Sequence, residues 1–313
     1  MTSIDLSLSS SERARSELDP ATLSAGEEII TRNGIIVLRG VIERGLLEEI
    51  HFHLRGLEEF VRSKRSPDTS EPFALRAQYR GAGRWDVPLK PVSPLLDPRL
   101  FGNWSVLPII LKWLRKDVHI VSIGVVTAFP NAPYGSIHRD STFGPRKNAT
   151  VFFALQDIRP EQGPTEYWLG THLDLPRPSV MKLAHEGIRS IRKYARGDLT
   201  GSYLLSDIVG EFGRETFQIP GRWKRPISSG WNRLNLAART QEYRCCAAVG
   251  DAYLADYAIL HRGGVNLSST PRRVLYIGFG CKGTQEPNYP WLVDLPSLER
   301  EKLGALSSLF PNP

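Results

Sequence analysis

The N-terminal part of the chain predicts a helix, a strand and a second helix, in that order. Residues 20–31 have a helical pattern, with Asp19 as a capping residue before Pro20 at the first helical position. The apolar run 34–40 is bounded by glycines and rich in β-branched residues, which predicts a buried strand. From 42 to 65 the apolar residues recur at intervals of three and four, which predicts an amphipathic helix.

The rest of the chain is dominated by short strand-like runs. The stretch 66–105 is rich in Pro and Gly but carries several aromatic residues, so we expect it to be ordered and irregular. A buried helix is predicted at 107–115. Strands are then predicted at 119–129, 150–155, 165–169, 243–249, 253–254 and 273–279. Short strands separated by Gly and Pro favour a β-sandwich or barrel core.

A segment of different character, residues 173–240, interrupts the strand pattern. It contains 12 Lys and Arg against 6 Asp and Glu, and therefore carries nearly all of the chain's net charge of +7. A long insertion between strands commonly forms a lid or binding loops. We therefore expect a single domain over residues 1–313, with a core at about 28–282 and this insertion as its lid.

Composition and termini exclude several classes of protein. Cys245 and Cys246 are adjacent and Cys281 stands apart, so there is neither a CxxC zinc motif nor a disulfide framework. The N-terminus lacks the features of a signal peptide, no run approaches the roughly 20 apolar residues that span a bilayer, and the C-terminal SLFPNP is not a peroxisomal signal. We expect a cytoplasmic protein. The positive charge is mild and the basic runs are short, so a nucleic-acid partner is not expected.

The residues with the most specific chemistry are His138, Asp140 and His261. On an extended backbone residues i and i+2 point the same way, so His138 and Asp140 can face one point. Two imidazoles and one carboxylate on one face of an octahedron are typical of non-heme Fe(II) oxygenases. Since a lone His-x-Asp is common by chance, the alternative interpretation is that these residues belong to turns and to the core.

A basic residue that could bind a carboxylate follows the second histidine in the sequence. Arg272 lies eleven positions after His261. When 2-oxoglutarate chelates iron through its keto and C1 carboxylate groups, its distal carboxylate needs a separate partner. The planar guanidinium of arginine binds a carboxylate with two parallel hydrogen bonds and stays charged. Arg272 is our candidate for that role, with Arg273 next.

The order of these motifs resembles the phytanoyl-CoA dioxygenase (PhyH) family of Fe(II)/2-oxoglutarate-dependent oxygenases. Residues 34–50 resemble the family's N-terminal strand and helix, 138–140 its first metal motif, 154–172 its central strand and turn, and 261–272 its last motif. The resemblance implies an α+β protein with a mainly β core. This core would be a double-stranded β-helix, that is, a cupin-like jelly roll with flanking helices.

The resemblance also implies roles for individual residues. The three candidate ligands would hold Fe(II), and Arg272 would bind the distal carboxylate of 2-oxoglutarate, with O2 as the second cosubstrate. Thr150 lies where the family often places a hydroxyl residue that reaches 2-oxoglutarate, and Thr127 is a further candidate contact. Because Asp140 keeps the carboxylate that related halogenases replace, halogenation is not expected. No substrate-binding residue is identified.

The implied function is oxidation of an unactivated C–H bond, most simply hydroxylation, with succinate and CO2 as coproducts. We expect a small, largely apolar organic substrate from secondary metabolism. Three alternatives stay open: an acyl-CoA 2-hydroxylase acting on a phytanoyl-CoA-like thioester, a non-catalytic jelly-roll binding protein, and a nucleic-acid demethylase. The substrate, the oxidised carbon and the oligomeric state are left open by the sequence.

Overall fold

The structure is a computed structural model of the chain. It describes residues 3–64, 78–79, 83–89, 94–95, 97–114, 118–135, 137–140, 148–173 and 240–281. The chain divides into two compact units, one formed by 1–172 with 243–313 and the other by 173–242. The elements below lie in the first unit, apart from Glu242 at the start of one strand. The expected lid lies outside the described residues except at its two ends, and the single-domain organisation stays a prediction.

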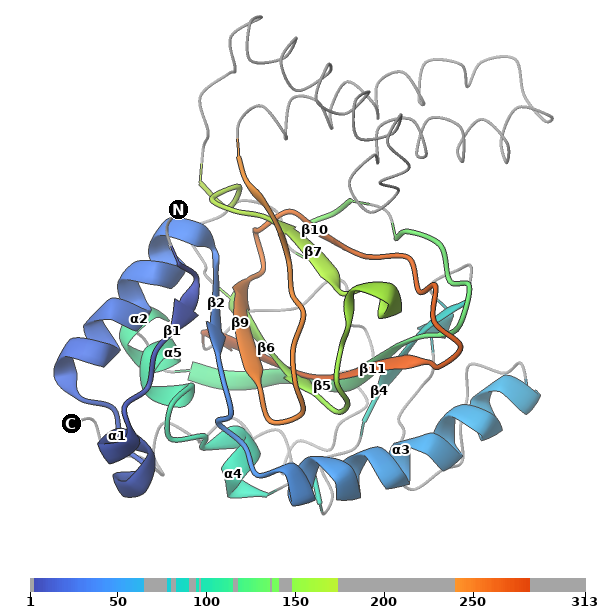
Figure 1. The fold of residues 1–313 in the computed structure, drawn as a ribbon, viewed down its shortest axis with the longest axis horizontal. Coiled ribbons are helices and arrows are strands. Elements are labelled where there is room, and N and C mark those ends of the chain that lie inside the picture. The colour runs from blue at the N-terminus through green and yellow to red at the C-terminus, as the bar shows by residue number, and fades with distance from the viewer. Residues whose placement is uncertain are drawn as a thin grey trace, which may run out of the picture. The chain divides into compact units, whose positions relative to one another are not determined.

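The described strands form two sheets (Figure 1). The larger has eight strands in the order β1-β2-β9-β6-β11-β5-β4-β3, and the smaller has three in the order β10-β7-β8. Apart from the parallel β1–β2 pair, neighbours in the large sheet are antiparallel. The strand bounds are β1 Asp5–Leu6, β2 Ile35–Leu38, β3 Gln78–Tyr79, β4 Arg84–Pro88, β5 Val118–Ala128, β6 Asn148–Ala154, β7 Thr165–Trp168, β8 Glu242–Arg244, β9 Ala252–Asp256, β10 His261–Gly263 and β11 Arg272–Cys281.

The helices precede most of the strands in the chain. They are α1 Ser10–Arg15, α2 Pro20–Asn33, α3 Arg44–Lys64, α4 Pro98–Phe101, α5 Leu107–Leu114 and the 3-10 turn η1 Pro160–Gln162. Helix α2 has Pro20 in its first turn and ends at Gly34, whose φ of 77° is in the left-handed region that glycine tolerates. None of the helices in the described ranges combines the length and the apolar character that crossing a lipid bilayer requires.

The large sheet separates two hydrophobic clusters. On β2, Ile36 and Leu38 belong to a cluster with α2, α3 and α5, whereas Ile35 and Val37 belong to one with β7. This alternation follows from the two-residue period of a strand. We call the helix side the outer face and the β7 side the inner face. In Figure 1, α3 and the β7–β10 pair lie on opposite sides of the large sheet.

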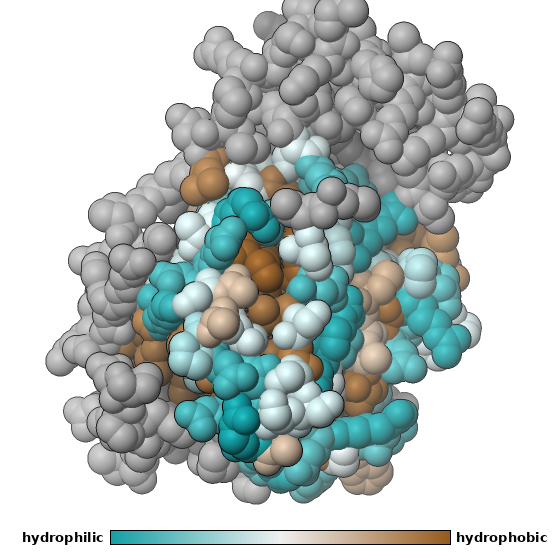
Figure 2. Space-filling view, turned by 60° about the vertical axis from the view of Figure 1, so that its left-hand side comes forward, coloured by the Kyte–Doolittle hydropathy of each residue, from teal (hydrophilic) through white to brown (hydrophobic). Residues whose placement is uncertain are grey.

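This arrangement is the expected jelly-roll core with flanking helices. Figure 2 shows hydrophobic residues between hydrophilic ones on the face in view, which is usual because apolar atoms contribute much of a folded protein's accessible surface. Two expectations were wrong in detail. Part of the stretch expected to be irregular, Arg84–Pro88, is strand β4, paired with β5. The strand expected at 243–249 ends at Arg244.

Candidate active site

Backbone pairing brings His138 and His261 together. His138 lies between β5 and β6, and His261 begins β10. The two residues form an isolated antiparallel bridge in which each amide donates to the other's carbonyl at 3.0 Å. The amide of Asp140 donates to the carbonyl of Tyr257 at 2.9 Å. The predicted candidate ligands therefore come from segments that the backbone holds side by side.

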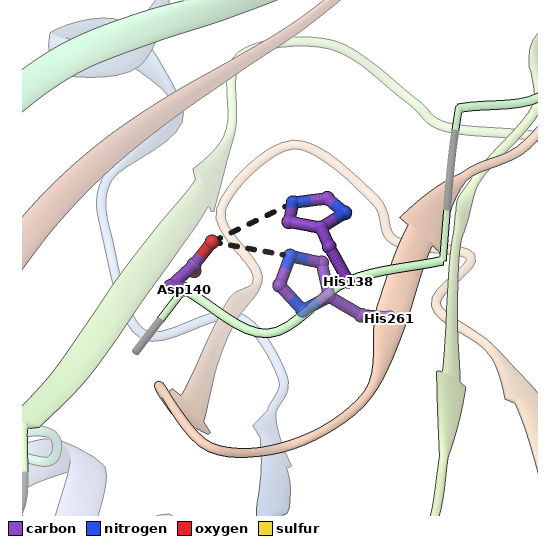
Figure 3. Close-up of side chains that lie close together, drawn as sticks. All are labelled: His138, Asp140 and His261. Carbon is purple, nitrogen blue, oxygen red and sulfur yellow. Dashed lines mark ion pairs between the residues drawn. The ribbon is translucent and has the colours of Figure 1, made fainter. Parts of the chain in front are cut away.

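The three side chains point toward one another (Figure 3). The Oδ1 atom of Asp140 is 3.6 Å from Nε2 of His138 and 3.6 Å from Nε2 of His261. The candidate ligand atoms all lie within 4.8 Å of one another. Neighbouring ligands on a metal with bonds of about 2.1 Å are roughly 3 Å apart, so small side-chain shifts suffice to close around an ion. Two imidazoles and one carboxylate fit Fe(II) as a facial set of ligands.

Each residue of this set has a different exposure. The side chain of His138 is 49% exposed, against 18% for Asp140 and 11% for His261. Nδ1 of His261 lies 3.1 Å from the carbonyl oxygen of Ile259, which can accept a hydrogen bond only when Nδ1 carries the hydrogen. In that tautomer Nε2 of His261 carries a lone pair that is available to a metal, on the side of the ring that faces Asp140.

Arg272 is the first residue of β11 and is buried. Its Nη1 donates to the carbonyl of Gly163, and its Nε has no hydrogen-bond partner. Burial lowers the pKa of Arg272 below its ordinary value, because a guanidinium removed from water loses its hydration. It shares the inner face with Val274, two residues along the strand. A buried cation with an unsatisfied N–H donor is suited to bind a carboxylate.

Comparison with protein families agrees with this geometry. The family model described as phytanoyl-CoA dioxygenase (PhyH) matches residues 30–274, well over half of the chain. The chain belongs to the PhyH family. It is therefore a non-heme Fe(II)/2-oxoglutarate-dependent enzyme, with Fe(II) as cofactor and 2-oxoglutarate and O2 as cosubstrates. No sequence among the curated proteins matches this PhyH-family chain.

Solved structures share the fold of this PhyH-family enzyme at low sequence identity. The non-heme alpha-ketoglutarate-dependent epimerase SnoN from nogalamycin biosynthesis is 17% identical, with 89% of this chain and 91% of SnoN covered and a TM-score of 0.55. The carbocyclase SnoK from the same biosynthesis is 13% identical, with 89% and 91% covered and a TM-score of 0.52. HygX from Streptomyces hygroscopicus, solved with nickel and 2-oxoglutarate, is 17% identical, with 86% and 89% covered and a TM-score of 0.51.

The PhyH-family enzyme has further buried arginines that sequence reasoning missed. Nε of Arg262 pairs with Glu166 at 2.7 Å across the β7–β10 pair, and its guanidinium lies 3.8 Å from the ring centroid of Tyr134. Nη2 of Arg84 donates to the carbonyl of Pro133 at 2.6 Å. Burial, followed by the charges of Arg272 and Arg262, lowers the pKa of Arg84 to about 9. Positive charge therefore accumulates around Arg272, which suits an anionic ligand.

The two threonines predicted to contact the cosubstrate lie in different places. Thr127 is paired with Arg273 and Trp85 and so points to the outer face, whereas Arg272 points to the inner face. A strand places successive side chains on opposite faces of the sheet, so Thr127 and Arg272 lie on different faces, and a contact of Thr127 with the cosubstrate stays a prediction.

Thr150 is on the inner face but toward the other end of the sheet. It is paired with Gly278, six positions along β11 from Arg272, which is roughly 20 Å at about 3.4 Å per residue. The nearby Asn148 accepts a backbone hydrogen bond from Tyr257, whose own carbonyl holds the amide of Asp140. Thr150 therefore lies nearer to the segment that anchors Asp140 than to Arg272, and its contact with the cosubstrate stays a prediction.

Proposed function

We propose that this PhyH-family enzyme binds Fe(II) through His138, Asp140 and His261 and binds the distal carboxylate of 2-oxoglutarate through Arg272. It uses them to oxidise an unactivated C–H bond, most simply by hydroxylation. The observation that carries the proposal is the convergence of two imidazoles and a carboxylate in a chain that also buries a partly unsatisfied arginine. The complete set of candidate residues favours an enzyme over a non-catalytic binding protein.

Bound iron and 2-oxoglutarate would supply the oxidising chemistry, with succinate and CO2 as coproducts. The chain's own residues orient these groups. The carbonyl of Ile259 sets the tautomer of His261, and the carbonyl of Tyr257 holds the backbone of Asp140. Arg272 offers a fixed positive charge at one end of the inner face. The apolar residues around it, including Val274 and Ala154, keep water from competing for that charge.

The substrate that we propose is a small, largely apolar molecule of secondary metabolism. SnoN and SnoK are named for nogalamycin biosynthesis, and HygX has been solved with hygromycin B bound. These names support a secondary metabolite as the substrate class of this chain. SnoN is an epimerase and SnoK a carbocyclase. Product analysis should therefore look first for epimerised or cyclised products beside the hydroxylated one.

The proposal is tested by metal binding and by conversion of 2-oxoglutarate to succinate after anaerobic addition of Fe(II). We expect His138→Ala to weaken Fe(II) binding by more than about a hundredfold, since losing even an outer-shell partner costs up to that much, and to abolish succinate formation. His53→Ala is the matched control, because His53 is exposed on α3. A wild-type protein that binds neither iron nor 2-oxoglutarate would end the proposal.

The family's description suggests a second candidate substrate, an acyl-CoA thioester. The phosphates of coenzyme A would make its affinity fall as salt is added, because exposed charges are screened. Isothermal titration of the protein with an acyl-CoA at low and high salt separates the two candidates. Binding that is absent, or that is indifferent to salt, would leave the small apolar substrate.

A further inference from the structure

The phenol of Tyr167 is a buried polar group without a partner. Tyr167 is on β7 and is 1% exposed, and its Oη has no hydrogen bond. A buried hydroxyl that is left unsatisfied costs about 1–3 kcal/mol of stability. Its neighbour on the inner face, Tyr253, differs because its hydroxyl is hydrogen bonded to the side chain of Thr165. Tyr167 therefore has a donor that the folded chain leaves unused.

The position of Tyr167 ties it to the candidate metal site. It is the cross-strand partner of His261 in the β7–β10 pair, and the two rings stack with centroids 5.6 Å apart. Burial raises the pKa of the phenol well above its ordinary value, and both Asp140 and Arg272 are near enough to act on it. The ring thus lies against one candidate ligand, with its hydroxyl in the field of both the carboxylate and the arginine.

Nε of Arg272 and Oη of Tyr167 are among the buried donors without a partner. Both residues lie on the inner face, because Tyr167 shares an apolar cluster with Val274, two positions after Arg272. The buried carboxylate in their vicinity, Glu166, already accepts from Arg262 at 2.7 Å and pairs with Arg244 at 3.4 Å. An incoming carboxylate has two oxygens and about four acceptor sites, so it can satisfy an arginine and a phenol together. Its negative charge would also offset the positive charge of Arg84 and Arg272.

We propose that Tyr167 is a positioning residue for 2-oxoglutarate, whose phenol donates a hydrogen bond to the distal carboxylate held by Arg272. This inference rests on the proposed function of Arg272. It assigns Tyr167 to selection of a dicarboxylate: a 2-oxo acid without the distal carboxylate leaves both buried donors unsatisfied. Such unpaired donors are what makes a polar site reject an analogue that lacks the matching group.

The experiment compares two ligands on two proteins. Wild-type protein and Tyr167→Phe, each loaded with Ni(II) in place of Fe(II), are titrated calorimetrically with 2-oxoglutarate and with 2-oxobutanoate, which lacks the distal carboxylate. We expect the variant to bind 2-oxoglutarate about ten- to a hundredfold more weakly and 2-oxobutanoate unchanged. Tyr243→Phe is the control, since its phenol lies 3.5 Å from Arg39, and it should change neither affinity.

A second measurement separates this role from a merely structural one. Because the phenol has no partner in the free chain, Tyr167→Phe should unfold at the same or a higher temperature than wild type without ligand. Equal weakening for both ligands, or no weakening, would overturn the inference. If wild type binds 2-oxoglutarate and Arg272→Met does not, while Tyr167→Phe binds normally, the inference about Tyr167 fails and the proposed function stands.

Discussion

At the scale of single residues, two adjacent arginines have opposite surroundings. Arg272 points to the inner face and is buried with a free Nε, whereas Nη1 of Arg273 contacts Nε2 of His51 on α3 at 3.1 Å. The alternation of the strand therefore assigns the two neighbours to different tasks. In the proposed function Arg272 binds a ligand, whereas Arg273 joins the sheet to helix α3 through His51.

This difference gives a matched pair of substitutions. We expect Arg272→Met to raise the KM for 2-oxoglutarate on the order of a hundredfold, because it removes one partner of a buried ion pair. Arg272→Lys should recover part of the loss, since lysine keeps the charge without the planar fork. Arg273→Met should leave the KM within about twofold of wild type. Initial rates of succinate formation measure all three, and similar effects at both positions would contradict the assignment.

At the scale of elements, the turn between η1 and β7 depends on one glycine. Gly163 has a φ of +67°, and a Cβ there would clash with the backbone carbonyls of Val265 and Gly264. Its own carbonyl accepts the hydrogen bond from Arg272. The absence of a side chain thus lets the segment before β7 approach the segment before β11.

We expect Gly163→Ala to lower the free energy of unfolding by at least about 2 kcal/mol, because both the φ and the contact are unfavourable for alanine. Gly45→Ala is the control: Gly45 lies in the first turn of α3 with nothing near its missing Cβ. That change should be neutral or stabilise the helix by up to about 1 kcal/mol. Denaturant unfolding measures both variants, and equal stabilities would refute the explanation.

Elements with a local pattern could be predicted from sequence, whereas elements made by distant pairing could not. Helix α2 was evident from Pro20 at its start and Gly34 at its end, and α3 from its periodicity, although Asp19, the expected cap of α2, makes no capping hydrogen bond. Strand β10 has three residues, too few for an alternating pattern, and exists because β7 pairs with it. Strand β4 lies in a Pro- and Gly-rich stretch and could not be predicted either, because it is formed by pairing with β5.

The same distinction applies to the site. His138, Asp140 and His261 could be proposed because their spacing carries the chemistry. The face on which Thr127 lies depends on its register with Arg273, which the sequence alone does not give. Arg84 and Tyr167 lie in no recognisable sequence motif. Their surroundings, and so their possible roles, are set by strands that are far away in sequence. Burial and unsatisfied hydrogen bonding, which only a folded chain has, reveal them.

At the scale of the whole molecule, stability should depend on pH through His51. Burial, followed by the charges of Arg273 and Arg55, lowers the pKa of His51 from 6.5 to about 4. As the pH falls, the unfolded chain therefore takes up this proton first, and the free energy of unfolding declines from about pH 6.5 down to about pH 4. The loss should stay below about 3 kcal/mol, because the ring is partly exposed.

Urea unfolding at a series of pH values tests this dependence. We expect the free energy of unfolding of His51→Gln to decline less than that of wild type between pH 6.5 and pH 4, since glutamine takes up no proton. His53→Gln, exposed on the same helix, should follow wild type. A His51→Gln curve parallel to that of wild type would show that other groups cause the acid sensitivity.

The row of paired residues that runs from His138 through His261 to Tyr167 joins three segments distant in sequence. A row of this kind opens as a unit, because releasing one segment leaves the next without its backbone partners. Disassembly of the candidate iron site and local unfolding of the small sheet are then the same event. Backbone pairing would therefore hold the candidate ligands in register even without iron. When this pairing opens, the whole site would be lost at once.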